Sequence, residues 1–301
     1  MDLGGLLPEG LDIRGKIILI DLWSYTSLNC LDRMPFMRGM WARYGQLPFQ
    51  PIGIHVPEYD FSKGKDMLEM AVSGMGLEYP NSSDDEKLIW DGLGRPAVPS
   101  RFLFDANGAL RYSSSGLGGE QEIEAWVIRL LREMGSDLPM AGVVASKKGV
   151  SRCIEVVRCG ALQGEVGNDN EGEALKPCIF RDTADHETGL VYLDGCWMQE
   201  LQYLEHAGQE PGTFLFKFES SGLWAIISSD APAELDVSLD GEPVQMACAG
   251  RDISFKDGSS SIKVKGGALC QILDRLPMGA HELVIRFNGP GQRIFSLSCV
   301  F

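Results

Sequence analysis

A serine and a cysteine three residues apart, Ser27 and Cys30, stand where a strand-like run passes into an expected helix. Asp21 lies six residues before Ser27, directly after the apolar run 17–20. A thiol at a helix N-terminus loses its proton more readily, because unpaired backbone N–H groups and the helix dipole favour the thiolate. A second thiol one turn later can then resolve a mixed disulfide, and a buried carboxylate behind the pair can move protons. Ser27 occupies the first position, and its hydroxyl is not appreciably ionised at neutral pH, so it cannot start a disulfide exchange.

Further motifs accompany this segment at fixed spacing. They are Y-T-S-L-N-C over residues 25–30 with Pro35 after it, H-V-P-E over residues 55–58, and Trp90 nine residues before Pro99. In this order the motifs resemble those of the thioredoxin-like superfamily, and within it the TlpA/DipZ-type proteins, which carry Y-[ST]-C-I-N-C, H-[TS]-P-E and W-x7-W-P. The resemblance covers most of residues 12–134 and implies an α/β thioredoxin-like domain with a central mixed sheet flanked by helices.

The resemblance assigns roles to individual positions. Asp21 falls on the family's buried acidic residue, Cys30 on the second, resolving cysteine, and Pro99 on the cis-proline whose loop holds the substrate backbone. Trp23 matches the tryptophan on the same strand, and Val98 replaces the family's second tryptophan. The expected site is therefore a degenerate catalytic group, Ser27, Cys30 and Asp21, beside a substrate-binding group, Trp23, Val98 and Pro99.

Three interpretations of Cys30 remain open. A buried free cysteine commonly packs as a small hydrophobic residue and reacts poorly. Peroxiredoxin-like proteins use [TS]-x-x-C with the reactive cysteine second, but the proline of their P-x-x-x-[TS]-x-x-C pattern is Trp23 here. A monothiol that captures glutathione or a substrate thiol is the third interpretation. Asp21 would be a proton relay for an active Cys30, or a hydrogen-bonded remnant if Cys30 is inactive.

His55 and Glu58 are further possible site residues, because they lie at the end of the strand-like run 50–56, at the sheet edge where α/β sites usually form. A structural turn is the competing interpretation. It is favoured, since the argument for catalysis rests on fold-level analogy.

Composition excludes several classes of function. The 27 basic and 42 acidic residues give a formal charge of −15, which would repel nucleic acid and an anionic membrane. None of the eight cysteines forms a C-x-x-C pair, and no Cys/His cluster has zinc-finger spacing. The sequence therefore predicts no metal and no cofactor, and its scattered cysteines fit a reducing compartment.

The sequence carries no recognisable targeting segment. No apolar stretch approaches the roughly 18–20 residues that cross a bilayer. The first ten residues lack the basic and apolar regions of a signal peptide. A cytoplasmic location is expected if Met1 is the native start. An extracytoplasmic one, typical of the resembled family, is expected if a signal or membrane segment has been removed.

The chain changes texture after Gly135, which predicts a first domain over residues 1–136 and a second over 137–301. The first domain alternates expected strands and helices: strand 16–23, helix 28–44, strand 50–56, helices 62–74 and 84–90, a hairpin over 101–113, and helix 120–134. From about residue 213, short strand-like runs separated by Asp-Gly and Asn-Gly turns predict an antiparallel β-sandwich. An irregular segment, 137–186, is expected to lead into it.

Motifs in the second domain also resemble a known module. L-D-G-C-W over 193–197, L-D-G-E-P over 239–243 and the closing segment 279–291 are similar to the β-sandwich appended to DipZ-type domains. That module resembles jelly-roll carbohydrate-binding modules, which implies carbohydrate as a possible partner. Trp197, Tyr203 and Trp224 are the candidate stacking residues, although core packing is the favoured interpretation, since aromatic residues dominate protein cores.

Two functions of different classes follow. A redox-inactive thioredoxin-like domain would keep the Pro99 groove for an extended peptide or protein. An enzyme would instead use Cys30 as a single thiol toward peroxides or mixed disulfides. The sequence favours the binding module, because the missing cysteine removes the first step of dithiol chemistry.

Overall fold

β1 (Ile17–Trp23) is the central strand of the N-terminal part, because all seven of its residues are buried and it pairs along both edges. β2 (Phe49–His55) pairs with it in parallel and β4 (Ser100–Phe104) antiparallel. β3 (Asn81–Ser83) and β5 (Leu110–Ser115) complete a five-stranded sheet in the order β3-β2-β1-β4-β5. The predicted mixed sheet is confirmed, and β3 is a short edge strand that the sequence analysis did not identify.

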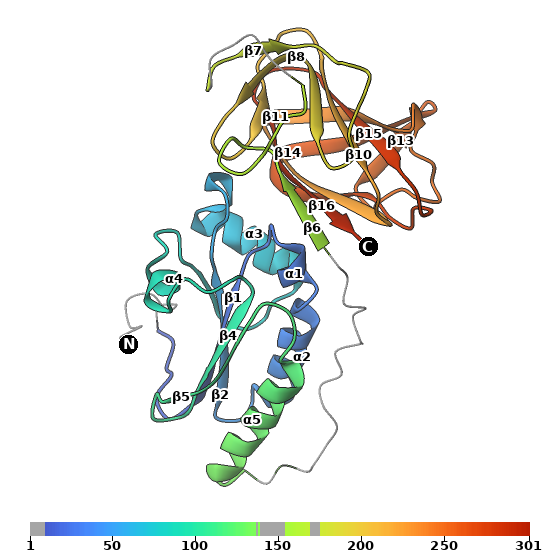
Figure 1. Ribbon diagram of the computed structural model, residues 1–301. Coiled ribbons are helices and arrows are strands. Elements are labelled where there is room, and N and C mark those ends of the chain that lie inside the picture. The colour runs from blue at the N-terminus through green and yellow to red at the C-terminus, as the bar shows by residue number, and fades with distance from the viewer. Residues whose placement is uncertain (1–9, 137, 139–153, 169–174) are drawn as a thin grey trace. The chain divides into compact units, whose positions relative to one another are not determined.

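The computed structural model describes residues 10–136, 138, 154–168 and 175–301 (Figure 1). The chain divides into two compact units, Met1–Ser151 and Arg152–Phe301. The domain boundary predicted between residues 136 and 137 adjoins residues outside the described ones and stays a prediction. Among the described residues, no helix combines the length and the apolar character needed to span a membrane.

In the described part of the N-terminal unit, five α-helices and a 3-10 turn accompany the strands. They are α1 (Leu28–Leu31), α2 (Met34–Tyr44), the 3-10 turn η1 (Asp60–Ser62), α3 (Lys65–Met75), α4 (Leu88–Gly92) and α5 (Glu120–Glu133). The single helix predicted over 28–44 is wrong, because the structure breaks it between Leu31 and Met34. Pro35 lies in the first turn of α2, where a missing N–H costs no helix hydrogen bond.

Alternate residues of β1 face opposite sides of the sheet, as the strand period requires. Positions 17, 19 and 23 pack with apolar side chains of α1, α2 and α5, whereas positions 18, 20 and 22 pack with Ile89 of α4. Figure 1 shows α2 and α5 beside one face of the sheet and α4 beside the other. Asp21 belongs to the face covered by α1, α2 and α5, so its carboxylate is placed within the core.

The C-terminal unit is an all-β antiparallel structure. Its strands are β6 (Ile154–Arg158), β7 (Cys178–Phe180), β8 (Val191–Gln199), β9 (Leu204–His206), β10 (Gly212–Phe218), β11 (Gly222–Leu239), β12 (Glu242–Pro243), β13 (Ile253–Lys256), β14 (Ser259–Leu273), β15 (His281–Phe287) and β16 (Gln292–Val300). The Asp-Gly turn at 240–241 has positive φ at both residues, as a tight hairpin turn requires. Two short strands, β6 and β7, lie in the stretch 137–186 that was predicted to be irregular.

Six of these strands close into a barrel, in place of the predicted sandwich. β11 pairs with β16 through Gly222–Ser229 and with β15 through Asp236–Leu239, so the ring β11-β15-β10-β8-β9-β16 is complete. Register shifts between Ser229 and Ala233 mark a bulge where β11 bends. The sequence runs 223–228 and 234–239 therefore belong to one bent strand, and the bend lets it pair with two partners and close the ring.

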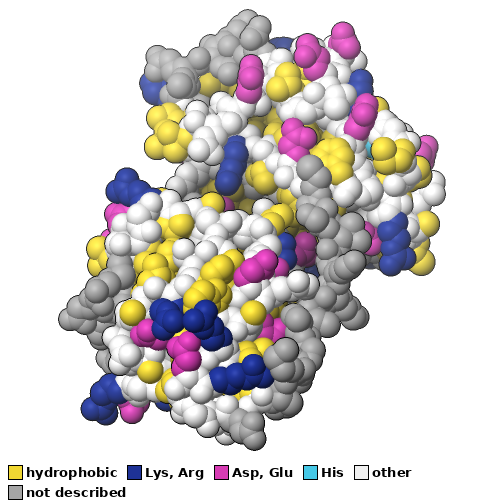
Figure 2. All heavy atoms as spheres, turned by 60° about the horizontal axis from the view of Figure 1, so that its bottom comes forward, with side chains coloured by type: hydrophobic (Ala, Val, Ile, Leu, Met, Phe, Trp, Pro, Cys, Tyr) yellow, Lys and Arg dark blue, Asp and Glu magenta, His cyan; other side chains and the backbone are white. Residues whose placement is uncertain are grey.

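The described surface mixes charges of both signs. On the face shown in Figure 2, basic side chains lie beside acidic ones.

Candidate functional site

The predicted site residues gather at one edge of the five-stranded sheet. β1 ends at Trp23 and leads into α1, while the parallel strand β2 ends at His55, which pairs with Trp23 in register. β4 runs antiparallel and begins at this same edge, where Ser100 pairs with Leu22. The segments that carry Ser27, His55 and Pro99 therefore meet at one edge, as the resemblance implies.

Cys30 is a buried thiol, only 1 % exposed. The pKa of Cys30 is raised to about 12, mainly by burial and in small part by the charges of Asp21 and Glu58. Hydrogen bonds from the Ser27 side chain and the Ser24 backbone act in the opposite direction but do not compensate. At neutral pH the group is therefore a protonated thiol, and the structure agrees with the interpretation of Cys30 as a small buried residue.

Ser27 is the N-cap residue of α1 and is half-buried. Its backbone is extended, and its carbonyl accepts hydrogen bonds from the N–H groups of Cys30 and Leu31, both at 3.0 Å. Its side chain makes no capping hydrogen bond to the helix. Ser27 therefore stands at the start of α1.

Asp21 is held in a buried ion pair. Arg101 Nε donates to Asp21 Oδ1 at 2.9 Å, and the two side chains are 3 % and 2 % exposed. Burial raises the pKa of Asp21, and the attraction of Arg101 only partly offsets it. Arg101 also reaches Glu120 Oε1 at 3.3 Å, and Glu120 pairs in turn with Arg33. Asp21 is thus one end of a four-residue charge network.

Arg101 and Glu120 are site residues that the sequence analysis missed. A signal was available for Arg101, because a charged residue two positions after the predicted cis-proline falls within an otherwise apolar strand. Only the register of β1 against β4 brings it opposite Asp21. Glu120 was visible only as the first residue of the closing helix.

His55 is fully buried between two aromatic rings. Its ring stacks on Tyr25 at 5.0 Å between centroids and meets the edge of Trp23 at 5.5 Å. Neither ring nitrogen has a hydrogen-bond partner among the described residues, and the Tyr25 hydroxyl is likewise buried and unpaired. Burial lowers the pKa of His55 to about 4, so it is neutral at physiological pH.

Glu58 is half-buried at the same edge, where it accepts a hydrogen bond from Thr26 Oγ1 at 2.8 Å. Thr26 in turn bonds Ser24 Oγ at 2.8 Å. This short chain ties the segment after β1 to the segment after β2. It gives Glu58 a structural role in the turn, which the sequence analysis favoured.

The Val98–Pro99 peptide bond is cis, as predicted. The Pro99 carbonyl accepts a hydrogen bond from the Gly116 N–H at 2.8 Å, which fixes the loop to the end of β5. Val98 is half-buried, and its own backbone makes no hydrogen bond to another described residue. The loop therefore offers an unpaired backbone N–H and carbonyl beside the site.

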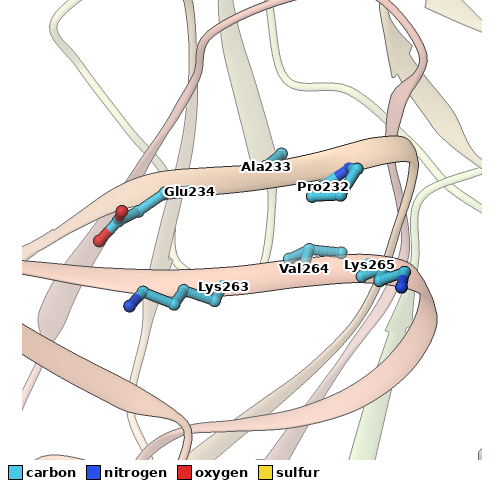
Figure 3. Close-up of a pocket in the computed structure, with 6 residues that line it drawn as sticks. All are labelled: Pro232, Ala233, Glu234, Lys263, Val264 and Lys265. Carbon is cyan, nitrogen blue, oxygen red and sulfur yellow. The ribbon is translucent and has the colours of Figure 1, made fainter.

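The C-terminal unit has a shallow hollow of about 330 Å³ between β11 and β14 (Figure 3). It is lined by Pro232, Ala233, Glu234, Lys263, Val264 and Lys265. Glu234 lies opposite Lys263 in the strand register, and its carboxylate accepts a hydrogen bond from the Ser261 hydroxyl at 2.6 Å. None of the predicted site residues lines this hollow.

No group of three or more His, Cys, Asp or Glu side chains in the described part of the chain could hold a metal ion. Trp197 is fully buried in the barrel core and Trp224 is 7 % exposed. Trp197 is therefore a core residue, whereas the Trp224 ring is buried beneath the Arg251 guanidinium and is not part of that core cluster. Tyr203 is half-buried.

Comparisons with known proteins agree with this geometry. The family described as "Thioredoxin like C-terminal domain" matches residues 163–298. Protein DipZ of Mycobacterium tuberculosis is 25 % identical over 242 residues, which are 79 % of this chain and 34 % of DipZ. The first unit is a thioredoxin-like domain. The second is a C-terminal β domain of the kind that accompanies it, and the chain spans about a third of the length of its DipZ relatives.

Two further proteins are similar to part of this chain. Thiol-disulfide oxidoreductase ResA of Bacillus anthracis is 23 % identical over 129 residues, which are 43 % of this chain and 72 % of ResA. A secreted Mycobacterium tuberculosis disulfide oxidoreductase homologous to E. coli DsbE has a crystal structure that matches with a TM-score of 0.32 and 18 % identity. That match covers 39 % of this chain and 84 % of the other.

Proposed function

We propose that this chain is a thioredoxin-like binding module that lacks dithiol-disulfide reductase activity, because Ser27 replaces its first active-site cysteine. The observation that carries this proposal is the state of the remaining thiol: Cys30 is 1 % exposed and has a pKa of about 12. A thiol that is neither ionised nor accessible cannot attack a disulfide. ResA is named an oxidoreductase, and this chain departs from dithiol chemistry at the attacking residue.

The peptide groove is supported by the loop at Pro99. Val98 presents its unpaired backbone N–H and carbonyl beside the end of β1. An extended peptide can satisfy such groups by the same main-chain pairing that joins two strands. The proposed ligand is therefore an extended peptide or protein segment that lies along Val98.

The alternative of a single-cysteine oxidoreductase is opposed by the burial of Cys30. A peroxide or mixed disulfide would have to reach a thiol enclosed by the core cluster that contains Trp23, Tyr25 and Met34. Carbohydrate binding to the C-terminal unit remains a separate prediction. It has less support, since Trp197 and Trp224 are buried.

Two measurements test the proposed function. Insulin-disulfide reduction should be absent in the native protein. The second measurement uses the double variant Ser27→Cys, Cys30→Ala, which places a thiol at the helix start without a second thiol to resolve a mixed disulfide. It should form a stable mixed disulfide with a synthetic extended peptide that carries one activated cysteine.

The control for trapping is the same double variant with Val98→Arg added, which places a bulky charge on the groove and should slow trapping by about tenfold or more. Reduction of insulin by the native protein would refute the redox-inactive assignment. Equal trapping rates with and without Val98→Arg would refute the proposed peptide groove.

A further inference from the structure

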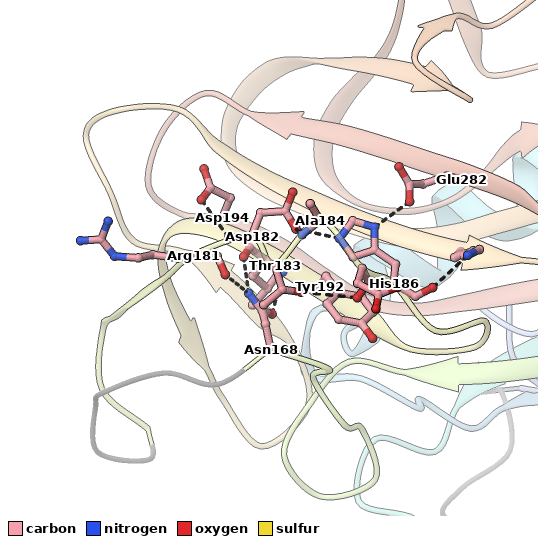
Figure 4. Close-up of polar contacts among 12 residues, drawn as sticks. Asn168, Arg181, Asp182, Thr183, Ala184, His186, Tyr192, Asp194 and Glu282 are labelled. Carbon is pink, nitrogen blue, oxygen red and sulfur yellow. Dashed lines mark hydrogen bonds and ion pairs between the residues drawn. The ribbon is translucent and has the colours of Figure 1, made fainter.

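His186 lies between two carboxylates in the C-terminal unit (Figure 4). Its Nδ1 is 2.6 Å from Glu282 Oε2, and its Nε2 is 2.7 Å from Asp182 Oδ1. Glu282 belongs to β15, whereas Asp182 and His186 belong to the loop 181–190 that connects β7 to β8. The His186 side chain, only 6 % exposed, therefore joins this loop to a strand of the barrel.

The two contacts can be satisfied together only when the site holds an additional proton. A neutral imidazole has one N–H donor and one acceptor nitrogen, and an ionised carboxylate can only accept. With a carboxylate at each nitrogen, a neutral ring would leave an acceptor facing an acceptor, whichever way the ring is turned. A protonated imidazolium can donate to both carboxylates at once, so the two short contacts fit a charged His186.

Other charged and polar groups around His186 also hold this loop. Lys217 Nζ, from β10, donates to the His186 carbonyl at 3.0 Å and stands opposite Glu282 in the β10–β15 pairing. The Tyr192 ring, from β8, lies 4.4 Å from the imidazole, and its hydroxyl accepts the Glu187 N–H. Asp194, also from β8, accepts a hydrogen bond from the Asp182 N–H.

Burial lowers the pKa of His186, but its hydrogen bonds to Glu282 and Asp182 outweigh this effect and leave the pKa above its usual value.

His281, the neighbour of Glu282, repeats the arrangement. Its Nδ1 is 2.8 Å from Asp240 Oδ2 and its Nε2 is 3.1 Å from the Pro277 carbonyl, so both nitrogens again face acceptors. Asp240 follows the end of β11, and Pro277 lies in the loop 274–280 that precedes β15. The Phe218 ring of β10, 6.1 Å away, also faces His281. The hydrogen bond to Asp240 is the main reason that the pKa of His281 is raised.

Both histidines act at one end of the barrel. The start of β15 pairs with the end of β10 and the end of β11, and the start of β8 pairs with the end of β10. We propose that this end of the barrel is a pH-sensitive clasp, in which protonated His186 and His281 hold the loops 181–190 and 274–280 to the start of β15. Loss of the two protons releases these loops while the barrel stays closed.

The direction of the response follows from the raised pKa values. A group that binds its proton more tightly in the folded state contributes stability below its unfolded pKa, about 6.5 for histidine, and loses it as pH rises through the higher folded value. The clasp is therefore closed in mildly acidic solution and opens on the alkaline side of neutrality.

The protein has only four histidines, so their titration can be resolved by NMR. The ring C–H shifts of His186 and His281 should titrate with pKa values above about 6.5. Hydrogen exchange, corrected for its intrinsic pH dependence, should show that the amides of Ala184, Glu187 and Leu276 lose protection as pH rises through the same range. Each of these amides now makes a hydrogen bond.

Glu282→Gln is the discriminating variant, because a carboxamide can donate to one ring nitrogen and so tolerates a neutral imidazole. It should lower the pKa of His186 and flatten the pH dependence of protection in loop 181–190. Glu187→Gln removes the same charge from an exposed side chain of that loop and should leave both unchanged. A wild-type pKa of His186 at or below about 6.5, or loop protection that does not change with pH, would overturn the proposal even if Glu282→Gln fails to fold.

Discussion

Asp21 on β1 and Arg101 on β4 are partners in the antiparallel register, and Arg101 Nε donates to Asp21 Oδ1 at 2.9 Å. Opposite residues of an antiparallel pair point to the same face, so the guanidinium is directed at the carboxylate. A carboxylate engaged in this way is fixed by its partner. Asp21 is therefore better described as part of a structural ion pair than as a free proton relay for Cys30.

Arg101→Met should destabilise the protein by about 3–5 kcal/mol, because it leaves the buried charges of Asp21 and Glu120 without their shared partner. Urea denaturation measures this as a lower midpoint. The double variant Asp21→Asn, Arg101→Met should lose less than Arg101→Met alone, since one of the uncompensated charges is gone. Arg14→Met, which removes an exposed partner of Asp12, is the control and should leave the midpoint unchanged. A midpoint for Arg101→Met equal to that of wild type would show that the ion pair adds no net stability.

Cys30 should be among the slowest thiols to alkylate. With a pKa of about 12, its thiolate fraction at about pH 8 is about a thousandfold below that of an unfolded cysteine. Iodoacetamide labelling followed by peptide mass spectrometry measures each cysteine separately. Cys196 and Cys248, which are both half-buried, should label well before Cys30, and Cys30 should label quickly only after unfolding in urea. Labelling of native Cys30 at the rate of Cys248 would support the monothiol enzyme instead.

The frame of the site could be predicted from the sequence, because the residues that define it are local. The run before Asp21, the serine and cysteine at the helix start, and Pro99 ahead of β4 each depend on a few neighbouring residues. The partner of Asp21 could not be predicted in this way. It depends on the register between two strands that are 80 residues apart in the chain.

The barrel of the second unit was predicted wrongly as a sandwich for a similar reason. Alternating residues identify strands, but they do not show that two runs on either side of Asp230 form one bent strand. The closure of the barrel depends on that bend, because β11 must reach both β15 and β16. Which strands meet around a ring is a long-range property, and the turn residues do not encode it.

Gly53 should not tolerate alanine. A Cβ at this position of β2 would overlap Asn81 Oδ1 and approach Trp23 Nε1 to 2.9 Å, which are the two atoms of the Trp23–Asn81 hydrogen bond. Gly53→Ala should cost about 1–3 kcal/mol in the free energy of unfolding, the usual range for overpacking. Gly74→Ala is the matched control: Gly74 lies in α3 with open space around its Cα, so alanine should stabilise by about 0.5–1 kcal/mol. Equal effects of the two substitutions would contradict the close approach at Gly53.

His55 should make the protein less stable in acid. Its folded pKa is about 4, below the unfolded value of about 6.5, so the unfolded chain takes up a proton first as pH falls. The free energy of unfolding is therefore highest, with respect to His55, above about pH 6.5, and it decreases as pH falls toward 4. The loss approaches about 3 kcal/mol, on the basis of 1.36 kcal/mol for each pKa unit.

His55→Phe tests this directly, because phenylalanine keeps the stacking on Tyr25 and removes two ring nitrogens that have no partner among the described residues. Replacing an unpaired buried polar group by an apolar one of similar shape is close to neutral or stabilising. The variant should match or exceed wild-type stability at about pH 7 and exceed it further at about pH 5. Urea denaturation at both pH values gives the comparison. A variant that is markedly less stable at about pH 7 would show that the ring nitrogens are hydrogen-bonded in solution, and the low pKa of His55 would then need another cause.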